Sequence, residues 1–282
     1  MNPAAMREVR YALRPCIQPK KVVIVGGGVA GMEAARTAAM RGHRVFLYEK
    51  NEALGGNLIP GGSHSFKKEV RELNAWYQNE LKGLPVDIHT GESVSSRQLR
   101  NMDADVIILA TGSVPVMPKV PGMDDEKVLG CMDAFAHPEK VGQKVVVIGG
   151  GLVGCEMALE YAQDGKEVTV VEALPEILSA GIPSPIPNGQ MLPDLFEHHK
   201  VSVLENHRLS AVEDGRVVLE SSGQKKSLDA DSVVIAVGFR PAPSMAQELS
   251  GCGAVVYEIG DGQKVSTILH AVWDGYEVGN NI

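Results

Sequence analysis

The chain repeats part of its own sequence, and this repeat sets the strongest limit on how it can fold. Residues 21–50 and 144–173 align at a constant offset of 123, and 13 of the 30 aligned positions are identical. The identities include the four glycines of a turn and a closing glutamate. Residues 104–115 and 230–241 form a second similar pair, at an offset of 126. We therefore expect two similar units, each opened by a glycine turn and closed by an apolar strand.

Each opening repeat has the pattern of a β-α-β unit. The runs 22–25 and 145–148 are continuously apolar and rich in β-branched residues, as in parallel strands that are buried on both faces. A helix follows each run and ends at Gly42 or Gly165. Right-handed crossovers then predict a doubly wound parallel sheet in each unit. The proline-rich stretch 179–193 is expected to be a loop.

The end of the chain decides how the two units are connected. Residues 254–259 are expected to form a strand and residues 267–282 a helix, and one strand with one helix cannot form a domain alone. We therefore assign both to the first unit. The predicted fold is α/β, with two Rossmann-like three-layer domains, the second inserted into a discontinuous first. The predicted boundaries are 20–114 with 254–282 for the first domain and 115–253 for the second.

Both glycine turns follow a strand and open a helix, the context in which such a turn binds a dinucleotide. The first glycine permits the tight turn, the second lets backbone N–H groups approach a pyrophosphate, and the third lets helix pack on strand. The helix N-terminus then holds the pyrophosphate. The predicted contacts are Gly26, Gly28 and Gly31 in the first unit and Gly149, Gly151 and Gly154 in the second.

A glutamate lies at the same offset after each turn. Glu49 and Glu172 are each expected to accept a hydrogen bond from an adenosine ribose hydroxyl. At the second site a carboxylate would repel a 2′-phosphate, and Ala173 and Leu174 offer no arginine to receive one. NADH is therefore the expected nucleotide rather than NADPH.

Composition excludes several partners. Lys and Arg number 27 against 35 Asp and Glu, giving a net charge of −8 that argues against nucleic acid or an anionic membrane surface. No apolar run reaches the roughly 20 residues that a membrane helix needs. The four cysteines include no C-x-x-C pair, so we expect no bound metal, no dithiol centre and a reducing cytoplasmic setting.

The order of these motifs resembles the flavoproteins with two dinucleotide-binding domains. In that superfamily the first domain holds FAD and the inserted domain holds NAD(P)H. The resemblance implies the same two cofactors here and adds further binding residues. They are Lys50, Gly55, Gly56 and Asn57 after the first glutamate, Ala110, Thr111 and Gly112 at one strand end, Gly238 at the other, and Gly260 and Asp261 near the C-terminus.

Glu156 resembles a glutamate near the nicotinamide–flavin contact of related reductases, which would make it a catalytic residue. We place it in the first turn of the second predicted helix, where the helix dipole alone also favours a glutamate. Both interpretations stay open at this point.

A narrower resemblance precedes residue 20. Residues 2–8, followed by Lys20, Lys21 and Val22, resemble the junction in 2-enoate reductase, 2,4-dienoyl-CoA reductase and trimethylamine dehydrogenase. In that group an old-yellow-enzyme-like barrel with FMN and a 4Fe-4S cluster precedes the module. The barrel and the cluster cysteines are absent here. We therefore expect a C-terminal piece of such a protein, with residues 1–19 as a linker and a barrel domain or subunit as partner.

The leading functional expectation is that NADH reduces FAD and that electrons continue to an iron–sulfur and FMN part that reduces an activated C=C bond. Two alternatives stay open. One is a nucleotide-binding module without turnover, and the other is a stand-alone NADH:acceptor reductase of the thioredoxin-reductase type.

Overall fold

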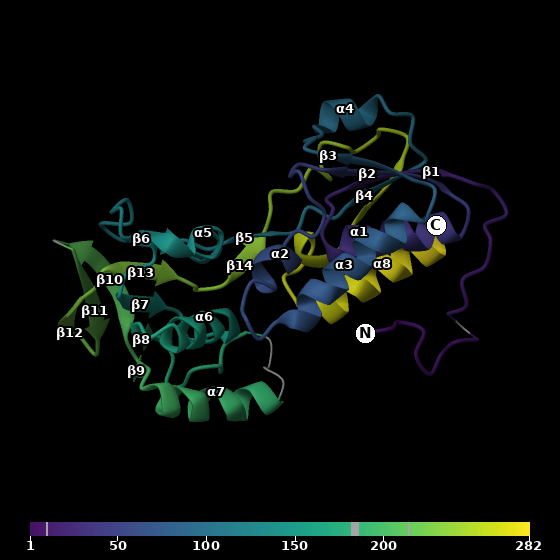
Figure 1. The fold of residues 1–282 in the computed structure, drawn as a ribbon. Helices are drawn as coiled ribbons and strands as arrows, with labels where there is room; N and C mark the ends of the chain where they lie inside the picture. Colours follow the sequence, from purple (N-terminus) through teal and green to yellow (C-terminus); the bar gives the residue numbers. More distant parts are fainter. Residues whose placement is uncertain (10, 182–185, 214) are drawn as a thin grey trace. The chain divides into compact units, whose positions relative to one another are not determined.

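The computed structural model describes residues 1–9, 11–181, 186–213 and 215–282. The chain divides into two compact units, which are described separately (Figure 1). The first unit comprises residues 1–63, 67–114 and 240–282, and the second comprises residues 64–66 and 115–239.

A five-stranded parallel sheet forms the centre of the first unit. Its strand order is β15-β4-β1-β2-β3, and every neighbouring pair is parallel. The C-terminal strand β15 therefore joins the sheet of the N-terminal unit through β4. The strands are β1 (Lys21–Val25), β2 (Arg44–Glu49), β3 (Val86–Thr90), β4 (Val106–Leu109) and β15 (Val255–Glu258).

Alternate residues of these strands face two different cores. Val22 and Ile24 face the helices α1 (Val29–Met40), α3 (Lys68–Lys82) and α8 (Ile268–Asn281), which cover one side of the sheet (Figure 1). Val23 faces the other side, where the short helix α4 (Ser96–Arg100) and Leu249 lie. The first unit is thus a three-layer structure.

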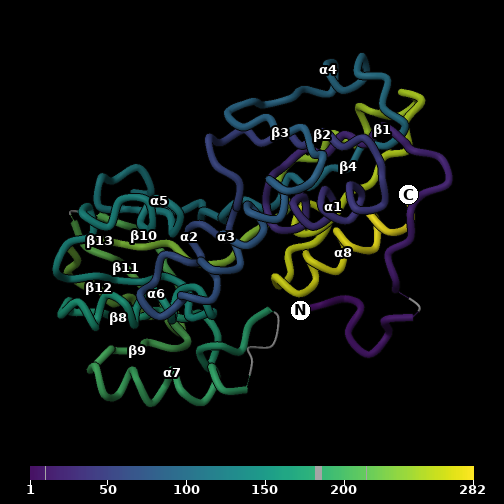
Figure 2. Tube along the Cα trace, turned by 45° about the vertical axis from the view of Figure 1, so that its right-hand side comes forward, coloured from purple at the N-terminus to yellow at the C-terminus, as the bar shows by residue number. Residues whose placement is uncertain are grey.

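Helices α1 and α8 pack unusually closely along their length (Figure 2). A Cβ atom on Gly275 would lie 2.4 Å from the carbonyl oxygen of Ala30, and one on Gly279 would lie 2.8 Å from Cβ of Thr37. Real Cβ atoms do not make such contacts, so the two glycines of α8 allow its backbone to approach α1. The C-terminal helix is therefore an integral part of the first unit.

The second unit has its own five-stranded parallel sheet, in the order β6-β13-β7-β8-β9. The strands β1 and β7, which precede the two glycine turns of the sequence repeat, are each the central strand of their sheet. The strands are β6 (Val128–Gly130), β7 (Lys144–Ile148), β8 (Glu167–Val171), β9 (Ser202–Leu204) and β13 (Ser232–Ile235).

Different layers cover the two faces of this second sheet. Val145 and Val147 face a core shared with α5 (Cys131–Ala136), α6 (Leu152–Gln163) and α7 (Ile186–His199). Val146 and Ile148 face an antiparallel sheet of β10 (Arg208–Glu213), β11 (Arg216–Ser221) and β12 (Gln224–Asp229). The predicted α/β class and the Rossmann-like layering are confirmed, with a β-sheet as the third layer of the second unit.

Two chain crossings connect the units. The outgoing strand β5 (Ser113–Pro115) pairs with the returning strand β14 (Phe239–Pro241). The second compact unit ends at Phe239, whereas the sequence-based boundary lies at residue 253. The difference arises because Leu249 is 1% exposed and packs against the first sheet, so residues 240–253 cluster with the first unit.

The expected loop at residues 179–193 is wrong for its second half. Residues 182–185 lie outside the described residues, but α7 begins at Ile186 and continues through Pro193 to His199. Leu192 and Phe196, one helical turn apart, are 1% and 3% exposed and pack into the core of the second unit. This apolar pair outweighs the helix-breaking tendency of the prolines.

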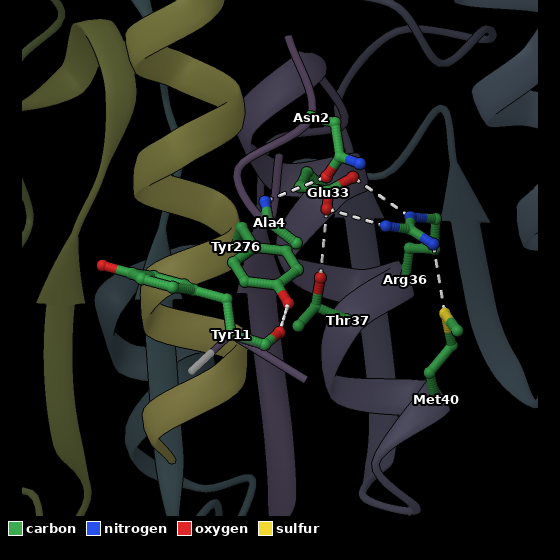
Figure 3. Close-up of polar contacts among 8 residues, drawn as sticks. All are labelled: Asn2, Ala4, Tyr11, Glu33, Arg36, Thr37, Met40 and Tyr276. Carbon is green, nitrogen blue, oxygen red and sulfur yellow. Dashed lines mark hydrogen bonds and ion pairs between the residues drawn. The ribbon is translucent and has the colours of Figure 1, made fainter. Parts of the chain in front are cut away.

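The N-terminal segment, which the sequence interprets as a linker, lies against the first unit. The backbone N–H of Cys16 donates to the carbonyl oxygen of Arg41 at 2.8 Å. The hydroxyl of Tyr276 in α8 donates to the carbonyl oxygen of Tyr11 (Figure 3). The described part of residues 1–19 contains turns but neither helix nor strand. Across all described residues, no helix combines the length and apolar character needed to span a bilayer.

Candidate functional site: two repeated dinucleotide cradles

Two glycines of the first turn are required by packing inside the chain. A Cβ atom on Gly26 would lie 2.2 Å from the carbonyl oxygen of Ala110, and Gly26 has φ +108°. A Cβ atom on Gly31 would lie 1.9 Å from the carbonyl oxygen of Gly26. The turn therefore meets the end of β4 directly, and it brings together the Gly26, Gly31 and Ala110 of the predicted site.

The middle glycine is different, because nothing in the described chain explains its lack of a side chain. A Cβ atom on Gly28 would meet no described atom within 4 Å. Gly28 is the N-cap of α1, and among the described side chains none caps the free N–H groups of that helix. Open space in front of uncapped N–H groups suits an anion such as a pyrophosphate. The residues of the first turn therefore fit FAD.

The second unit repeats this geometry. Cβ atoms on Gly149 and Gly154 would lie 2.4 Å and 2.0 Å from the carbonyl oxygens of Ala236 and Gly149. Gly151, the N-cap of α6, again faces space free of described atoms within 4 Å. The second turn therefore fits a dinucleotide on the same grounds.

The two glutamates make matching hydrogen bonds. The Oε2 atom of Glu49 accepts the N–H of Gly27 at 2.7 Å, and Oε2 of Glu172 accepts the N–H of Gly150 at 2.7 Å. Both carboxylates are buried, at 5% and 7% exposure. Each is therefore fixed at the end of its second strand and beside its glycine turn, where a ribose hydroxyl can reach the remaining lone pairs.

The two carboxylates differ in one donor. Oε1 of Glu49 accepts both the backbone N–H and the side-chain amide of Asn51, at 2.8 Å and 2.7 Å. The equivalent residue of the second unit is Leu174, whose backbone N–H donates to Oε1 of Glu172 at 2.8 Å. The Leu174 side chain has no donor, so Glu172 keeps more free acceptor capacity than Glu49.

The segment after Glu49 returns to the first glycine turn. Gly55 donates its N–H to the carbonyl oxygen of Gly27 at 2.8 Å and forms a parallel bridge with Gly28. A Cβ atom on Gly56 would lie 3.0 Å from Cα of Gly28. We call each glycine turn, with the helix start that follows it, a cradle (residues 26–31 in the first unit and 149–154 in the second). Gly55 and Gly56 thus lie against the first cradle, whereas Lys50 is exposed to solvent.

The second unit makes the same return contact with a different residue. Leu178, at the repeat offset from Gly55, donates its N–H to the carbonyl oxygen of Gly150 at 2.7 Å. Leu178 has φ +60°, a conformation that usually requires glycine. The structural repeat therefore extends beyond the stretch in which the two sequences are similar. The return hydrogen bond to the glycine turn is kept in the second unit, although leucine replaces glycine there.

The C-terminal motif lies beside the strand end of β4. Gly260, with φ +61°, donates its N–H to Oδ2 of Asp274 in α8 at 3.0 Å, which fixes the short helix η2 (Gly260–Gly262). A Cβ atom on Gly262 would lie 3.2 Å from Oγ1 of Thr111. The strand-end residues and the C-terminal turn are therefore neighbours in the folded chain. Gly112, with φ +71°, meets no described atom within 4 Å of a Cβ position.

Sequence reasoning missed one residue of this region. The hydroxyl of Ser113 donates to Oδ2 of Asp261 at 3.0 Å and accepts the amide of Asn57 at 3.3 Å. Ser113 follows the Ala110-Thr111-Gly112 strand end directly, and that adjacency was the one signal in the sequence. Gly238, at the equivalent strand end of the second unit, has φ +100° and faces space free of described atoms within 4 Å.

The structure corrects the position of Glu156. Helix α6 begins at Leu152, so Glu156 is its fifth residue and lies in the second turn rather than the first. The helix dipole acts within the first turn, so it gives little reason for a glutamate here. Glu156 is 8% exposed. Burial, with the Glu172 and Glu156 carboxylates nearby, raises the pKa of the Cys155 thiol to about 12.

The repeat-equivalent residue in the first unit is Glu33, and it has a structural role. Its carboxylate accepts both Nε and Nη2 of Arg36, at 3.1 Å and 2.9 Å, and the hydroxyl of Thr37 at 3.2 Å (Figure 3). Glu33 is 2% exposed. Burial and the Glu33 carboxylate raise the pKa of Tyr77. A repeated glutamate at this helix position is thus no proof of catalysis.

Residues 20–259 match the family model described as pyridine nucleotide-disulphide oxidoreductase. The chain belongs to this family. It is accordingly a flavin-dependent NADH oxidoreductase module that uses FAD and NADH.

Among its relatives, cinnamate reductase of Clostridium sporogenes is 44% identical over 282 residues, which are 100% of this chain and 42% of that protein. NADH oxidase of Thermoanaerobacter brockii is 36% identical over 284 residues, covering 99% of this chain and 43% of that protein. A solved structure of 2-naphthoyl-CoA reductase superposes with a TM-score of 0.91 at 31% identity and covers 100% of this chain and 43% of its own. The chain thus spans less than half the length of these relatives.

A further solved structure, histamine dehydrogenase from Rhizobium sp. 4-9, superposes with a TM-score of 0.84 over 100% of this chain and 47% of its own. Its identity is 20%, so it supports the fold alone. Among the described residues, no three or more His, Cys, Asp or Glu side chains gather as metal ligands would.

Proposed function

We propose that the first unit holds FAD, that the second unit binds NADH, and that the module passes electrons onward to an enoate-reducing barrel domain or subunit. The observation that carries the proposal is the repeated cradle. In both units the middle glycine faces open space, although its neighbours are glycines because the chain packs against them. Two matched cradles on one chain suit two dinucleotides.

Different residues of the first unit bind different parts of FAD. The N–H groups at Gly28 and the start of α1 hold the pyrophosphate, and Glu49 accepts a ribose hydroxyl of the adenosine half. Gly55 and Gly56 flank the pyrophosphate without side chains, and Asp261 accepts hydroxyls of the ribityl chain. When bound, FAD supplies an acceptor for the hydride of NADH that can release electrons one at a time.

In the second unit, Gly151 and the start of α6 hold the pyrophosphate of NADH, and Glu172 accepts ribose hydroxyls. A buried carboxylate at this position repels a 2′-phosphate, and the Leu174 side chain offers no cation to offset the repulsion. The second unit therefore prefers NADH over NADPH. Glu156, buried on α6, is the candidate for a catalytic residue toward the nicotinamide.

The onward partner is proposed from the relatives. Cinnamate reductase, which is 44% identical to this chain, is itself more than twice as long. A multifunctional alkene reductase/demethylase OYE of Caballeronia cordobensis is 32% identical over 180 residues. In the proposed parent enzyme, an FMN and a 4Fe-4S cluster outside these 282 residues would supply the chemistry for reducing an activated C=C bond. Neither group is expected on this chain, whose four cysteines are dispersed.

A paired assay tests the proposal. The FAD-loaded chain is mixed anaerobically with NADH and either a small dye or a 2-enoate such as cinnamate. We expect NADH oxidation with the dye and none with the enoate. Enoate reduction at a rate similar to dye reduction would make the module a complete ene-reductase. FAD-loaded protein that oxidises no NADH with the dye would instead support a nucleotide-binding module without turnover.

A further inference from the structure

Three segments that are far apart in the sequence meet through side chains in the first unit. Asn57 is the N-cap of the short helix α2 (Leu58–Gly61), Ser113 is the first residue of β5, and Asp261 lies in η2. The Asn57 amide donates to Oγ of Ser113 at 3.3 Å, and the Ser113 hydroxyl donates to Oδ2 of Asp261 at 3.0 Å.

The direction of these hydrogen bonds follows from the groups themselves. An ionised carboxylate only accepts, so the single hydroxyl proton of Ser113 goes to Asp261. The hydroxyl oxygen can then only accept from Asn57, and this requirement fixes the orientation of the Asn57 amide with its NH2 toward Ser113. One serine therefore orients the two other side chains.

The backbone around Ser113 and Asp261 is also held. The carbonyl oxygen of Gly112, beside Ser113, accepts the N–H of Ala242 at 2.9 Å. The second carboxylate oxygen of Asp261, Oδ1, accepts the N–H of Ser266 at 2.9 Å. With one donor on each oxygen, the carboxylate has a fixed plane and keeps a lone pair on each oxygen for a ligand.

The internal repeat supplies a comparison. At the offset of 126, the equivalent of Ser113 is Phe239, which has no hydroxyl. The two closing strands otherwise share their alanine and glycine at the strand end. The unit that carries Asp261 thus has a hydroxyl at this position, whereas the other unit has the phenyl ring of Phe239 there.

We propose that Ser113 is a positioning residue of the FAD site, which holds the Asp261 carboxylate and the Asn57 amide in one hydrogen-bonded chain before the cofactor binds. The inference rests on the proposed function, because it takes the first unit as the FAD site. Ser113 acts by preorganisation: the carboxylate that receives the cofactor hydroxyls does not have to be ordered during binding.

The test measures FAD affinity. Apoprotein of the 282-residue chain is titrated with FAD, and quenching of flavin fluorescence gives the Kd. Because a hydrogen bond to a charged acceptor is lost, Ser113→Ala should raise the Kd about tenfold. Ser113→Thr, which keeps the hydroxyl, should stay within about twofold of the parent chain. Ser93→Ala, a change at an exposed serine of the same unit, is the matched control and should leave the Kd unchanged.

A double-mutant cycle separates positioning from a general structural effect. If Ser113 acts through Asp261, Ser113→Ala should weaken FAD binding by no more than about twofold in an Asp261→Asn background. The thermal midpoint of the Ser113→Ala apoprotein should match that of the Ser93→Ala apoprotein. An unchanged Kd in Ser113→Ala, or equal losses in Ser113→Ala and Ser113→Thr, would overturn the inference.

The same titration distinguishes failure of the inference from failure of the proposed function. Parent apoprotein that binds FAD while Ser113→Ala binds it equally well overturns the role of Ser113 alone. Parent apoprotein that takes up no FAD overturns the assignment of the first unit as the FAD site, and the inference with it.

Discussion

At the scale of single residues, the glycines of each turn have two different reasons to be glycine. Gly31 is required because a Cβ atom there would lie 1.9 Å from the carbonyl oxygen of Gly26. Gly28 faces open space, and we attribute its lack of a side chain to the proposed cofactor. We therefore expect folding and cofactor binding to depend on different glycines of one motif.

This separation predicts opposite phenotypes. Gly28→Val should leave the urea unfolding midpoint of the apoprotein close to that of the parent chain while weakening FAD binding at least about tenfold, because a branched side chain fills the cradle. Gly31→Ala should destabilise the fold by about 1–3 kcal/mol, because helix α1 is pushed from β1. Full flavin occupancy in purified Gly28→Val would contradict the assignment.

The proposed preference for NADH depends on the surroundings of Glu172. Leu174 is one hydrogen bond from that carboxylate and is 38% exposed, so a longer polar side chain can be accommodated there. Leu174→Arg should raise the efficiency of NADPH relative to NADH by about tenfold, because a guanidinium can pair with a 2′-phosphate. Leu174→Gln, which adds no charge, is the control. Rapid-mixing reduction of the flavin with each nucleotide measures both ratios.

Cys155 should be chemically inert. Its side chain is fully buried, and burial raises its thiol pKa to about 12, so the reactive thiolate forms only as the pH approaches that value. We expect iodoacetamide at about pH 8 to leave Cys155 unmodified in the native chain while the partly exposed Cys16 and Cys252 react. Peptide mass spectrometry identifies the labelled sites. Rapid native labelling of Cys155 would contradict its described burial.

At the scale of elements, the C-terminal helix α8 is bound to α1 through glycines. The backbone approach at Gly275 and Gly279 leaves no room for a methyl group. Gly275→Ala should therefore lower the free energy of unfolding of the first unit by about 1–3 kcal/mol, as overpacking in a core does. Glu277→Ala, at an exposed position of the same helix, should change it by less than about 0.5 kcal/mol. Urea unfolding measures both, and equal effects would contradict the close packing.

The elements show what the sequence could and could not predict. Strands β1 and β7 and their glycine turns were predictable because local apolar runs and fixed spacings specify them. Helix α7 was not, because its prolines indicate a loop and its stability comes from Leu192 and Phe196 in the core. The antiparallel sheet β10–β12 was also missed, since its exposed faces dilute the apolar pattern by which a strand is recognised.

The residues of the candidate site also fall into those that the sequence predicts and those that it does not. Glu49 and Glu172 were predictable because a fixed offset from a glycine turn brings each back beside it. Ser113 was not, because its importance depends on three distant segments meeting around one hydroxyl. The placement of Glu156 in the first helical turn was wrong by two residues, because α6 begins at Leu152, directly after Gly151.

At the scale of the whole molecule, the chain is a flavin-dependent NADH oxidoreductase module of two related units. Each unit is a Rossmann-like fold with its own cradle, and two crossings at β5 and β14 connect them. The similarity of the cradles suits two dinucleotides with a common adenosine diphosphate part. The differences, Asn51 against Leu174 and Gly55 against Leu178, suit two ligands that are not the same.

The assignment of one dinucleotide to each unit is tested most directly by an anaerobic titration of the FAD-loaded chain with NADH, followed by the visible absorbance of the flavin. We expect about one equivalent of NADH to bleach the flavin of the parent chain. We expect the Gly151→Val variant to keep its flavin colour but to need far more NADH for bleaching, because the valine side chain fills only the second cradle. A parent flavin that stays oxidised, or a Gly151→Val flavin that is bleached as readily as that of the parent chain, would contradict the assignment of NADH to the second unit.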